Sequence, residues 1–260
     1  TLIPQLKKLD DTRIWDAGYM TSDDMAFDEM DEPHPYMAWG GRANFGDYMV
    51  KNPYPLGDLD YRPDILLSSL SSSSAQLVNE YGWIWLWRDG QPAKLTVHNY
   101  KFYLGNNSTT QQRRHLQAYW LQLETEWLRS ERTLAGVLAF CYLTNNYGFT
   151  GDWFIGDIKD LQPGPTLAWF RHCFAPAAAF IDLTDERYTR HVSPHQGGSE
   201  IVFNLVGVND QPNDVNGPVR VKLLDAGGKQ VAENNIEISI PAYGKCYVPT
   251  KLQLPQQSGG

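Results

Sequence analysis

The sequence predicts two regions of different fold class, an α/β region over residues 1–183 and an all-β region over residues 184–260. Two observations carry this prediction. In the first region, near-continuous apolar segments, typical of buried parallel strands, alternate with segments of helical periodicity. In the second region, short segments of alternating apolar and polar residues are separated by turn sequences.

The N-terminal part predicts two strands. Residues 1–9 are expected to form a short helix, and residues 10–13 a turn before a strand that ends near Asp16. Residues 21–35 are acidic, but their carboxylate spacing lacks the central glycine of a calcium loop, so a solvated loop is predicted. A second strand is expected over residues 34–39.

The next predicted strand ends in a carboxylate. Leu77 and Val78 are apolar, and Asn79 and Glu80 follow where a parallel strand delivers side chains into a cleft. Four aromatic residues come next: Tyr81, Trp83, Trp85 and Trp87. Sugar rings stack on such residues, so a carboxylate beside them indicates glycoside chemistry. The alternative is a half-buried strand with a solvated or ion-paired glutamate.

A helix and a strand follow. After irregular residues 91–107, apolar residues at helical spacing predict a helix over residues 109–132, capped by Ser108 or Thr109. Residues 136–143 are predicted to form a strand buried on both faces. The loop after that strand is polar and aromatic, with Asn145, Asn146, Tyr147, Asp152 and Trp153. A second helix is expected over residues 165–180.

Alternating segments at residues 200–206, 219–224 and 236–240 predict antiparallel strands. Turns are expected at residues 209–212, 216–217 and 226–228. The size and pattern indicate an Ig-like β-sandwich.

The order strand, helix, strand, helix is that of one half of a TIM (β/α)8 barrel. Strand ends are predicted at Asp16, Tyr36, Glu80 and Tyr142, and a closed barrel needs eight. Because an open half-barrel would expose strand edges, the N-terminal half is expected to precede Thr1 or to come from another chain.

These residues resemble the C-terminal half of glycoside hydrolase family 2, the group of β-galactosidases and β-glucuronidases. Residues 1–183 would be barrel strands five to eight, and the following sandwich would match the domain after the barrel. The segment Glu80-Tyr81-Gly82 matches the catalytic nucleophile after strand seven, and Pro35-Tyr36 matches the tyrosine that orients it. Residues 10–13 resemble the turn before strand five.

Two departures from the family pattern stand out. The strand-eight tryptophan is replaced by Phe140 or Tyr142, which alters the substrate floor. The acid/base, the glutamate of an Asn-Glu pair after strand four, is expected upstream of Thr1. Asn79-Glu80 is itself such a pair, so an acid/base role for Glu80 stays open, although only one more barrel strand fits before the sandwich.

The resemblance implies retaining hydrolysis of β-galactoside or β-glucuronide bonds. Glu80 would attack the anomeric carbon, and a second carboxyl about 5–5.5 Å away would protonate the leaving oxygen. Tyr36 would donate a hydrogen bond to Glu80 and keep it ionised. The substrate contacts we expect are Asp16, His34, Trp39, Asn79, Trp83, Tyr142, Asn145 and Trp153. Each of four contacts has an alternative role. Asp16 could cap a strand end, His34 could bind the acidic loop, and Trp39 and Trp153 could serve only in packing.

Composition and motifs limit the classes of partner and cofactor that this chain is expected to bind. A net charge of −8 opposes nucleic-acid binding, and no apolar run approaches the ~20 residues of a membrane span. Three widely separated cysteines indicate no metal site, and no dinucleotide or phosphate-binding motif predicts a cofactor. The expected partners are a carbohydrate and the N-terminal barrel half. A periplasmic or extracellular location is favoured if a leader precedes Thr1.

Two other functions remain open. The aromatic cleft could bind glycans without hydrolysing them, because no acid/base lies in this sequence. The sandwich could also have a purely structural role, for which the sequence offers no argument in either direction.

Overall fold

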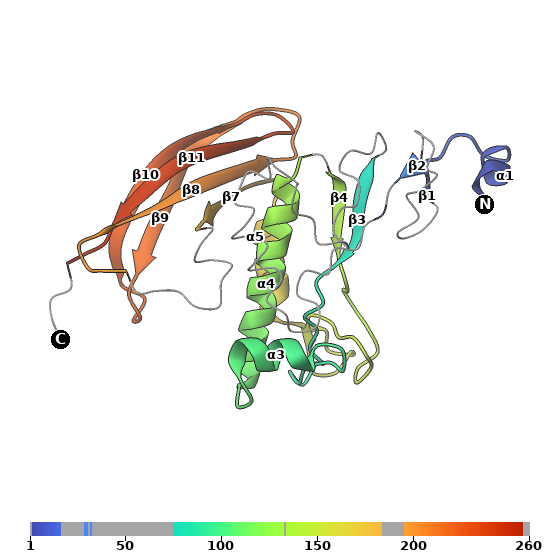
Figure 1. Ribbon diagram of the computed structural model, residues 1–260, viewed down its shortest axis with the longest axis horizontal. Helices are drawn as coiled ribbons and strands as arrows, with labels where there is room; N and C mark the ends of the chain where they lie inside the picture. Colours follow the sequence, from blue (N-terminus) through green and yellow to red (C-terminus); the bar gives the residue numbers. More distant parts are fainter. Residues whose placement is uncertain are drawn as a thin grey trace. The chain divides into compact units, whose positions relative to one another are not determined.

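A computed structural model of the chain describes residues 2–16, 29–30, 32, 75–132, 134–183 and 195–256. These residues fall into two compact units, which divide between Cys173 and Phe174. The first unit combines helices with short parallel strand pairs, and the second consists of antiparallel strands (Figure 1). The mixed helix-and-sheet class is therefore confirmed. No helix within the described ranges is long and apolar enough to cross a membrane.

The N-terminal residues form helix α1 (Ile3–Lys7), a turn, and strand β1 (Trp15–Asp16), which pairs in parallel with β2 (Glu29–Met30). The Asp10 carboxylate closes the turn. It accepts hydrogen bonds from the backbone nitrogen and hydroxyl of Thr12 at 3.0 and 2.6 Å, and from Arg13 Nε at 2.8 Å. These bonds, chiefly those from Thr12, lower the pKa of Asp10. The predicted turn before the first strand is confirmed.

The centre of the first unit is a β–α–β segment. Strand β3 (Gln76–Tyr81) leads through α3 (Val97–Leu104) to the long helix α4 (Thr110–Ser130), and the chain returns as β4 (Leu134–Ala139). The strands pair in parallel, with Leu77 opposite Gly136, and α4 runs antiparallel to both (Figure 1). Apolar content predicted a strand at each of these two places, and helical periodicity predicted α4. The prediction that residues 136–143 form a strand buried on both faces and ending at Tyr142 is wrong, because β4 ends at Ala139 and its residues are half-buried or exposed.

Helix α4 begins with a capping box. The Thr109 hydroxyl accepts a hydrogen bond from Gln112 N at 3.2 Å, and Gln112 Oε1 accepts one from Thr109 N at 2.8 Å. This arrangement satisfies backbone donors that the first helical turn would otherwise leave without partners. It confirms Thr109 as the start signal, one of the two predicted caps.

A hydrogen bond between the side-chain hydroxyls of Tyr81 and Thr125 joins strand β3 to α4. Tyr81 Oη lies 2.5 Å from Thr125 Oγ1, and Thr125 Oγ1 donates to Leu121 O at 2.6 Å. The single hydroxyl proton of Thr125 is thus used within the helix, so Tyr81 is the donor to Thr125. Gly82 follows where the chain lies close to α4, because an added Cβ there would meet Leu121 Cδ2 at 3.1 Å.

Two predictions about helices in this unit were also wrong. Residues 91–107 were expected to be irregular, but α3 forms there, held by Asn99 Nδ2 donating to Trp83 O at 2.8 Å and Tyr100 Oη donating to Ile84 O at 2.9 Å. These contacts are tertiary, so local periodicity did not reveal them.

The helix predicted over residues 165–180 is too long. Helix α5 (Pro165–Cys173) ends three residues before Pro176, and strand β7 (Ala177–Asp182) follows. A proline disfavours helical conformation in the residue before it, which stops α5 despite the alanines beyond.

In the second unit, β7, β8 (Glu200–Asn209) and β11 (Lys245–Gln253) form an antiparallel sheet with β8 in the centre. Strands β9 (Val215–Leu224) and β10 (Gln230–Ile240) form a second antiparallel pair. Because β7 pairs with β8 along its whole length, residues 177–182 belong with these strands, ahead of the predicted boundary at residue 184.

The two sheets of this unit share one hydrophobic core, formed by Phe203, Leu205, Val221, Ile238, Ile240 and Leu252. The turns predicted after β8 and β9 are present. The turn predicted at Asn216-Gly217 is wrong, because both residues pair with β10 inside β9. Strand β11 has no counterpart among the strands predicted from the sequence.

Candidate functional site

The site predicted from the sequence lies at the carboxyl end of β3. Val78 pairs with Val137 and Tyr81 with Ala139, so β3 carries one extra residue between these pairs. Asn79 and Glu80 occupy this β-bulge, and both are half-buried. A bulge re-aims side chains and is common beside active sites. The bulge sets Glu80 apart from a regular strand residue.

Asn79 has an unusual hydrogen-bonding state. Its Oδ1 atom is buried and has no hydrogen-bond partner. A buried acceptor without a donor costs free energy, so such an atom is a candidate for contact with a ligand or water. It lies next to Glu80 in the same bulge.

The end of β4 lies beside the end of β3. Phe140 N donates to Tyr81 O at 3.1 Å, and Phe140 O accepts a hydrogen bond from Trp85 Nε1 at 2.8 Å. Cys141 follows, and its thiol contacts Gly151 O at 3.4 Å. Burial raises the pKa of Cys141 to about 12, with added contributions from the charges of Asp152 and Glu80. Glu80 and Asp152 therefore both act on one thiol at this end of the strands.

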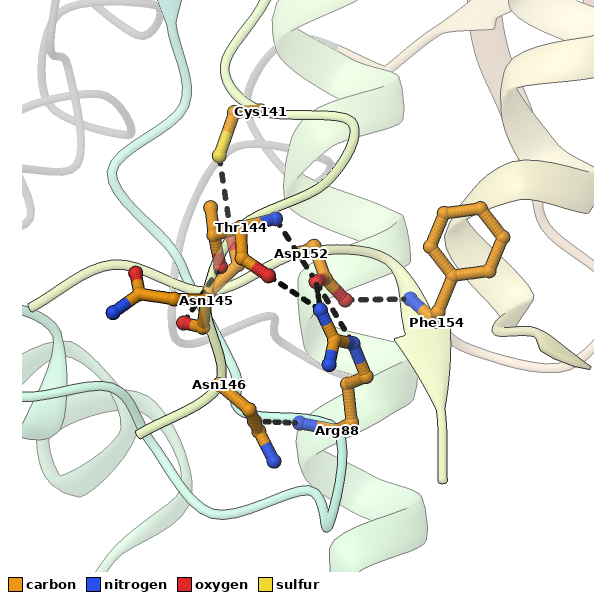
Figure 2. A network of polar contacts seen from close by, with 8 residues as sticks. Arg88, Cys141, Thr144, Asn145, Asn146, Asp152 and Phe154 are labelled. Carbon is orange, nitrogen blue, oxygen red and sulfur yellow. Dashed lines mark hydrogen bonds and ion pairs between the residues drawn. The ribbon is translucent and has the colours of Figure 1, made fainter. Parts of the chain in front are cut away.

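The loops after β3 and β4 are joined by the buried pair Arg88 and Asp152 (Figure 2). Asp152 Oδ2 accepts from Arg88 Nε at 3.0 Å and from Arg88 Nη2 at 2.7 Å. The same carboxylate accepts from Thr144 N at 3.2 Å and Phe154 N at 3.1 Å, and Arg88 N donates to Asn146 Oδ1 at 3.0 Å. We refer to these five residues as the loop clamp.

The loop clamp has a structural role. Asp152 is 3% exposed and accepts hydrogen bonds at both oxygens, so it is not available to exchange a proton with a substrate. The sequence did not single out Arg88 or this pair. The signal that could have found the clamp is the pairing of one arginine and one aspartate in two loops that follow neighbouring parallel strands.

The aromatic run after Glu80 is divided between core and surface. Tyr81 is fully buried and Trp85 is 2% exposed, so the expectation that both would form a sugar-binding floor is wrong. Trp83 and Trp87 are half-buried. Trp83 has a positive φ of 63°, and its ring centroid lies 4.9 Å from that of Trp85. Alternation along the run thus places every second aromatic residue in the core.

The loop after β4 contains three predicted substrate contacts. Tyr142 is 60% exposed and makes edge contacts with Trp153 and Phe154. Trp153 is 6% exposed, and its ring centroid lies 4.7 Å from that of Phe170, so it offers a ligand little surface. Asn145 is exposed, and its amide points away from Asp152 (Figure 2). Of these three, Tyr142 is the best placed for a ligand.

The remaining predicted contacts lie elsewhere. Asp16 ends β1, on the separate β1–β2 sheet. His34, Tyr36 and Trp39 lie outside the described residues. The structure therefore brings together Glu80, Asn79 and the start of the β4 loop.

Within the described ranges, no group of three or more His, Cys, Asp or Glu side chains could hold a metal ion. Comparison of the chain with protein-family models, curated proteins and solved structures finds no match. A half-buried carboxylate in a bulge, beside a buried amide oxygen without a partner, is suited to contact a polar ligand.

Proposed function

We propose that this chain is the nucleophile-bearing part of a retaining β-glycosidase, acting on β-galactoside or β-glucuronide-type carbohydrates. Glu80 is the nucleophile, and it attacks the anomeric carbon to form a covalent glycosyl-enzyme. The first unit, up to Cys173, would then belong to the C-terminal half of a (β/α)8 barrel, and the strands from β7 onward would form an Ig-like sandwich. The acid/base glutamate would lie outside this sequence.

The observation that carries this proposal is the bulge at the end of β3. In an enclosing barrel, the carboxyl ends of parallel strands form the catalytic face, and Glu80 lies at such an end. Asn79 beside it holds a buried oxygen with no hydrogen-bond partner, which a sugar hydroxyl could supply. Tyr142 adds an exposed aromatic ring after β4.

A second function, glycan binding without hydrolysis, is favoured by the state of Asp152. The charges of Asp152 and Glu80 both raise the pKa of the Cys141 thiol, so the two carboxylates are close to the same group. Both oxygens of Asp152, however, accept hydrogen bonds within the loop clamp. Asp152 therefore cannot serve as the acid/base for Glu80.

The test uses a leaving group that needs no acid catalyst. The chain is incubated with 2-deoxy-2-fluoro β-glycosides that carry dinitrophenol, and its mass is measured before and after digestion. We expect the mass of one fluoro-sugar to be added at Glu80 by at least one galactoside or glucuronide.

Two variants complete this experiment. Glu80→Gln should abolish labelling, whereas Asp157→Asn, which changes an exposed carboxylate, should leave it unchanged. The binding function would instead be supported by a folded chain that no fluoro-sugar labels and whose affinity for oligosaccharides is the same before and after the Glu80→Gln substitution. Labelling at any other residue would overturn the assignment of Glu80.

A further inference from the structure

A cavity of about 390 Å³ opens beside the start of α4, away from the Glu80 bulge. It is lined by the segment after β3, by α3 and by the residues that precede α4. Its apolar lining includes Trp87, Pro92 and Tyr100, and its polar lining includes Gln91, Lys101 and Arg113. This volume is in the range of about 300–1,000 Å³ that small-molecule sites occupy.

The charges in this cavity are all positive. Lys101 and Arg113 are cations, and none of the ten lining residues, all of which the structure describes, is an aspartate or glutamate. The chain as a whole carries a net charge of −8. A cavity with only cations on an acidic protein therefore departs from the average of the surface and favours an anion.

Arg113 is the more informative cation, because it is 8% exposed. Its guanidinium donates to Gly90 O at 2.7 Å, to Ser108 O, to Ser108 Oγ at 3.3 Å and to Thr110 Oγ1 at 3.2 Å. Every one of these acceptors is neutral. In the part of the chain that the structure describes, neither Arg113 nor Lys101 forms an ion pair. A buried charge without a counter-ion is costly, and an anionic ligand would supply one.

Trp87 gives the cavity a fixed aromatic wall. Its Nε1 donates to Gly148 O at 3.0 Å, and its ring meets Tyr147 edge-on at 5.2 Å and 72°. The indole is therefore held in place before any ligand arrives, which reduces the entropy lost on binding. The apolar face of a sugar ring fits such a wall, and the side chains of Gln91 and Asn106 can bond its hydroxyls.

We propose that this cavity binds an anionic sugar unit, a uronic acid or a sulfated sugar, with the ring against Trp87 and the anionic group at Lys101 and Arg113. The choice of a sugar rests on the proposed glycosidase function, whereas the choice of an anion rests on the cavity alone. The site is separate from Glu80 and holds a part of a saccharide that is not cleaved.

The experiment titrates the full chain with glucuronic acid, sulfated glucose, glucose and inorganic sulfate, followed by saturation-transfer NMR and calorimetry. We expect both anionic sugars to bind about tenfold more tightly than glucose and than sulfate alone, since ring and charge each contribute. Lys101→Gln, at an exposed position, should weaken the anionic sugars about fivefold and leave glucose unchanged.

The matched control is Lys94→Gln. Lys94 is exposed in the segment before α3, lies over the Phe149 ring and does not line the cavity, so its replacement should change no affinity. Equal binding of glucose and glucuronic acid, or equal effects of the two lysine variants, would overturn the proposal. Sulfate binding as tight as the sugars would overturn its saccharide part.

Glu80→Gln separates this proposal from the previous one. It should abolish covalent labelling and leave glucuronic acid binding at the cavity unchanged. If the parent chain binds glucuronic acid and the Glu80→Gln variant does not, the cavity is not the anion site. This conclusion does not depend on whether the parent chain is labelled at Glu80.

Discussion

Arg88 and Asp152 form an ion pair that is buried on both sides, with side-chain exposures of 6% and 1% and an Nη2 to Oδ2 distance of 2.7 Å. The pair joins the loop after β3 to the loop after β4 across 64 residues of sequence. Because Glu80 lies near the end of β3 and Cys141 near the start of the loop after β4, the position of the candidate site depends on this contact.

Asp152→Asn should therefore destabilise the first unit strongly. The substitution leaves the Arg88 guanidinium buried without a counter-ion, which costs about 3–5 kcal/mol. Urea unfolding followed by tryptophan fluorescence is the suitable measurement. The eight tryptophans that the structure describes all lie in the first unit, so their signal reports on that unit.

Asp157→Asn provides the comparison for this substitution. Asp157 pairs with Lys159 at 3.6 Å, and both side chains are exposed, so the loss should be below about 1 kcal/mol. Similar effects of the two substitutions would show that the Arg88–Asp152 pair does not hold the loops.

The sequence predicted those elements of the first unit that are encoded within a single segment. The apolar run of β3, the helical spacing of α4 and the Thr109 cap each lie within one segment, and each is present. The Arg88–Asp152 contact, α3 and the burial of Trp85 depend on neighbours that are distant in sequence. Periodicity does not contain that information.

The same limit applies to the candidate site. The position of Glu80 at a strand end followed from the apolar residues before it, but the bulge follows from the register with β4. The interpretation of Trp153 as a substrate contact considered only its loop, whereas the Phe170 ring on α5 covers it. The position of a residue at a strand end is thus easier to predict from sequence than how much of its side chain is exposed to a ligand.

Glu124 on α4 is a buried carboxyl group that destabilises the fold. It is 0% exposed, neither carboxyl oxygen has a hydrogen-bond partner, and burial raises its pKa well above the ordinary value of 4.5. The folded chain therefore keeps this group protonated to a higher pH than the unfolded chain, which ionises near the ordinary value. The stability therefore falls as pH rises above about 4.5.

Glu124→Met, which keeps similar volume, should stabilise the first unit at pH 7 by about 1–3 kcal/mol. The gain should shrink as pH is lowered through 4.5, because both states of the parent chain are then protonated. Urea unfolding between pH 4 and pH 8 measures this difference. Asp160→Asn, at an exposed acid, is the control, and a pH-independent gain from Glu124→Met would contradict the raised pKa.

Gly151 is required by the close approach of two segments beside the loop clamp. A Cβ at this position would lie 1.9 Å from Leu86 O and 2.5 Å from the Leu86 carbonyl carbon. Both atoms are backbone, so they cannot rotate away. Gly151→Ala should cost about 1–3 kcal/mol in urea unfolding, since backbone must shift to relieve the overlap.

Gly148→Ala is the matched control for that substitution. There the nearest atom to an added Cβ is Asn145 Oδ1 at 3.1 Å, at the end of an exposed side chain that can move. We expect a change of less than about 0.5 kcal/mol. Equal losses at the two glycines would mean that the approach of Gly151 to Leu86 is not essential.

Cys141 can report where the Glu80 charge lies. Its pKa is raised to about 12 by burial, then by Asp152 and then by Glu80. Removing the Glu80 charge makes the thiolate less unfavourable, which lowers this pKa and increases the thiolate fraction at a fixed alkaline pH. Glu80→Gln should therefore speed alkylation of Cys141 by iodoacetamide about two- to fivefold, because the thiolate is the reacting species.

Cys173 serves as the internal reference for this rate. Its pKa is also raised to about 12, by burial and then by Glu126, and Glu80 does not contribute. Peptide mass spectrometry can follow both cysteines in one sample, so a general loosening of the first unit would speed both reactions. Faster alkylation at Cys141 alone would place the Glu80 carboxylate beside the end of β4. An unchanged Cys141 rate would place it elsewhere, and the proposed nucleophile would lose its position at this end of the two strands.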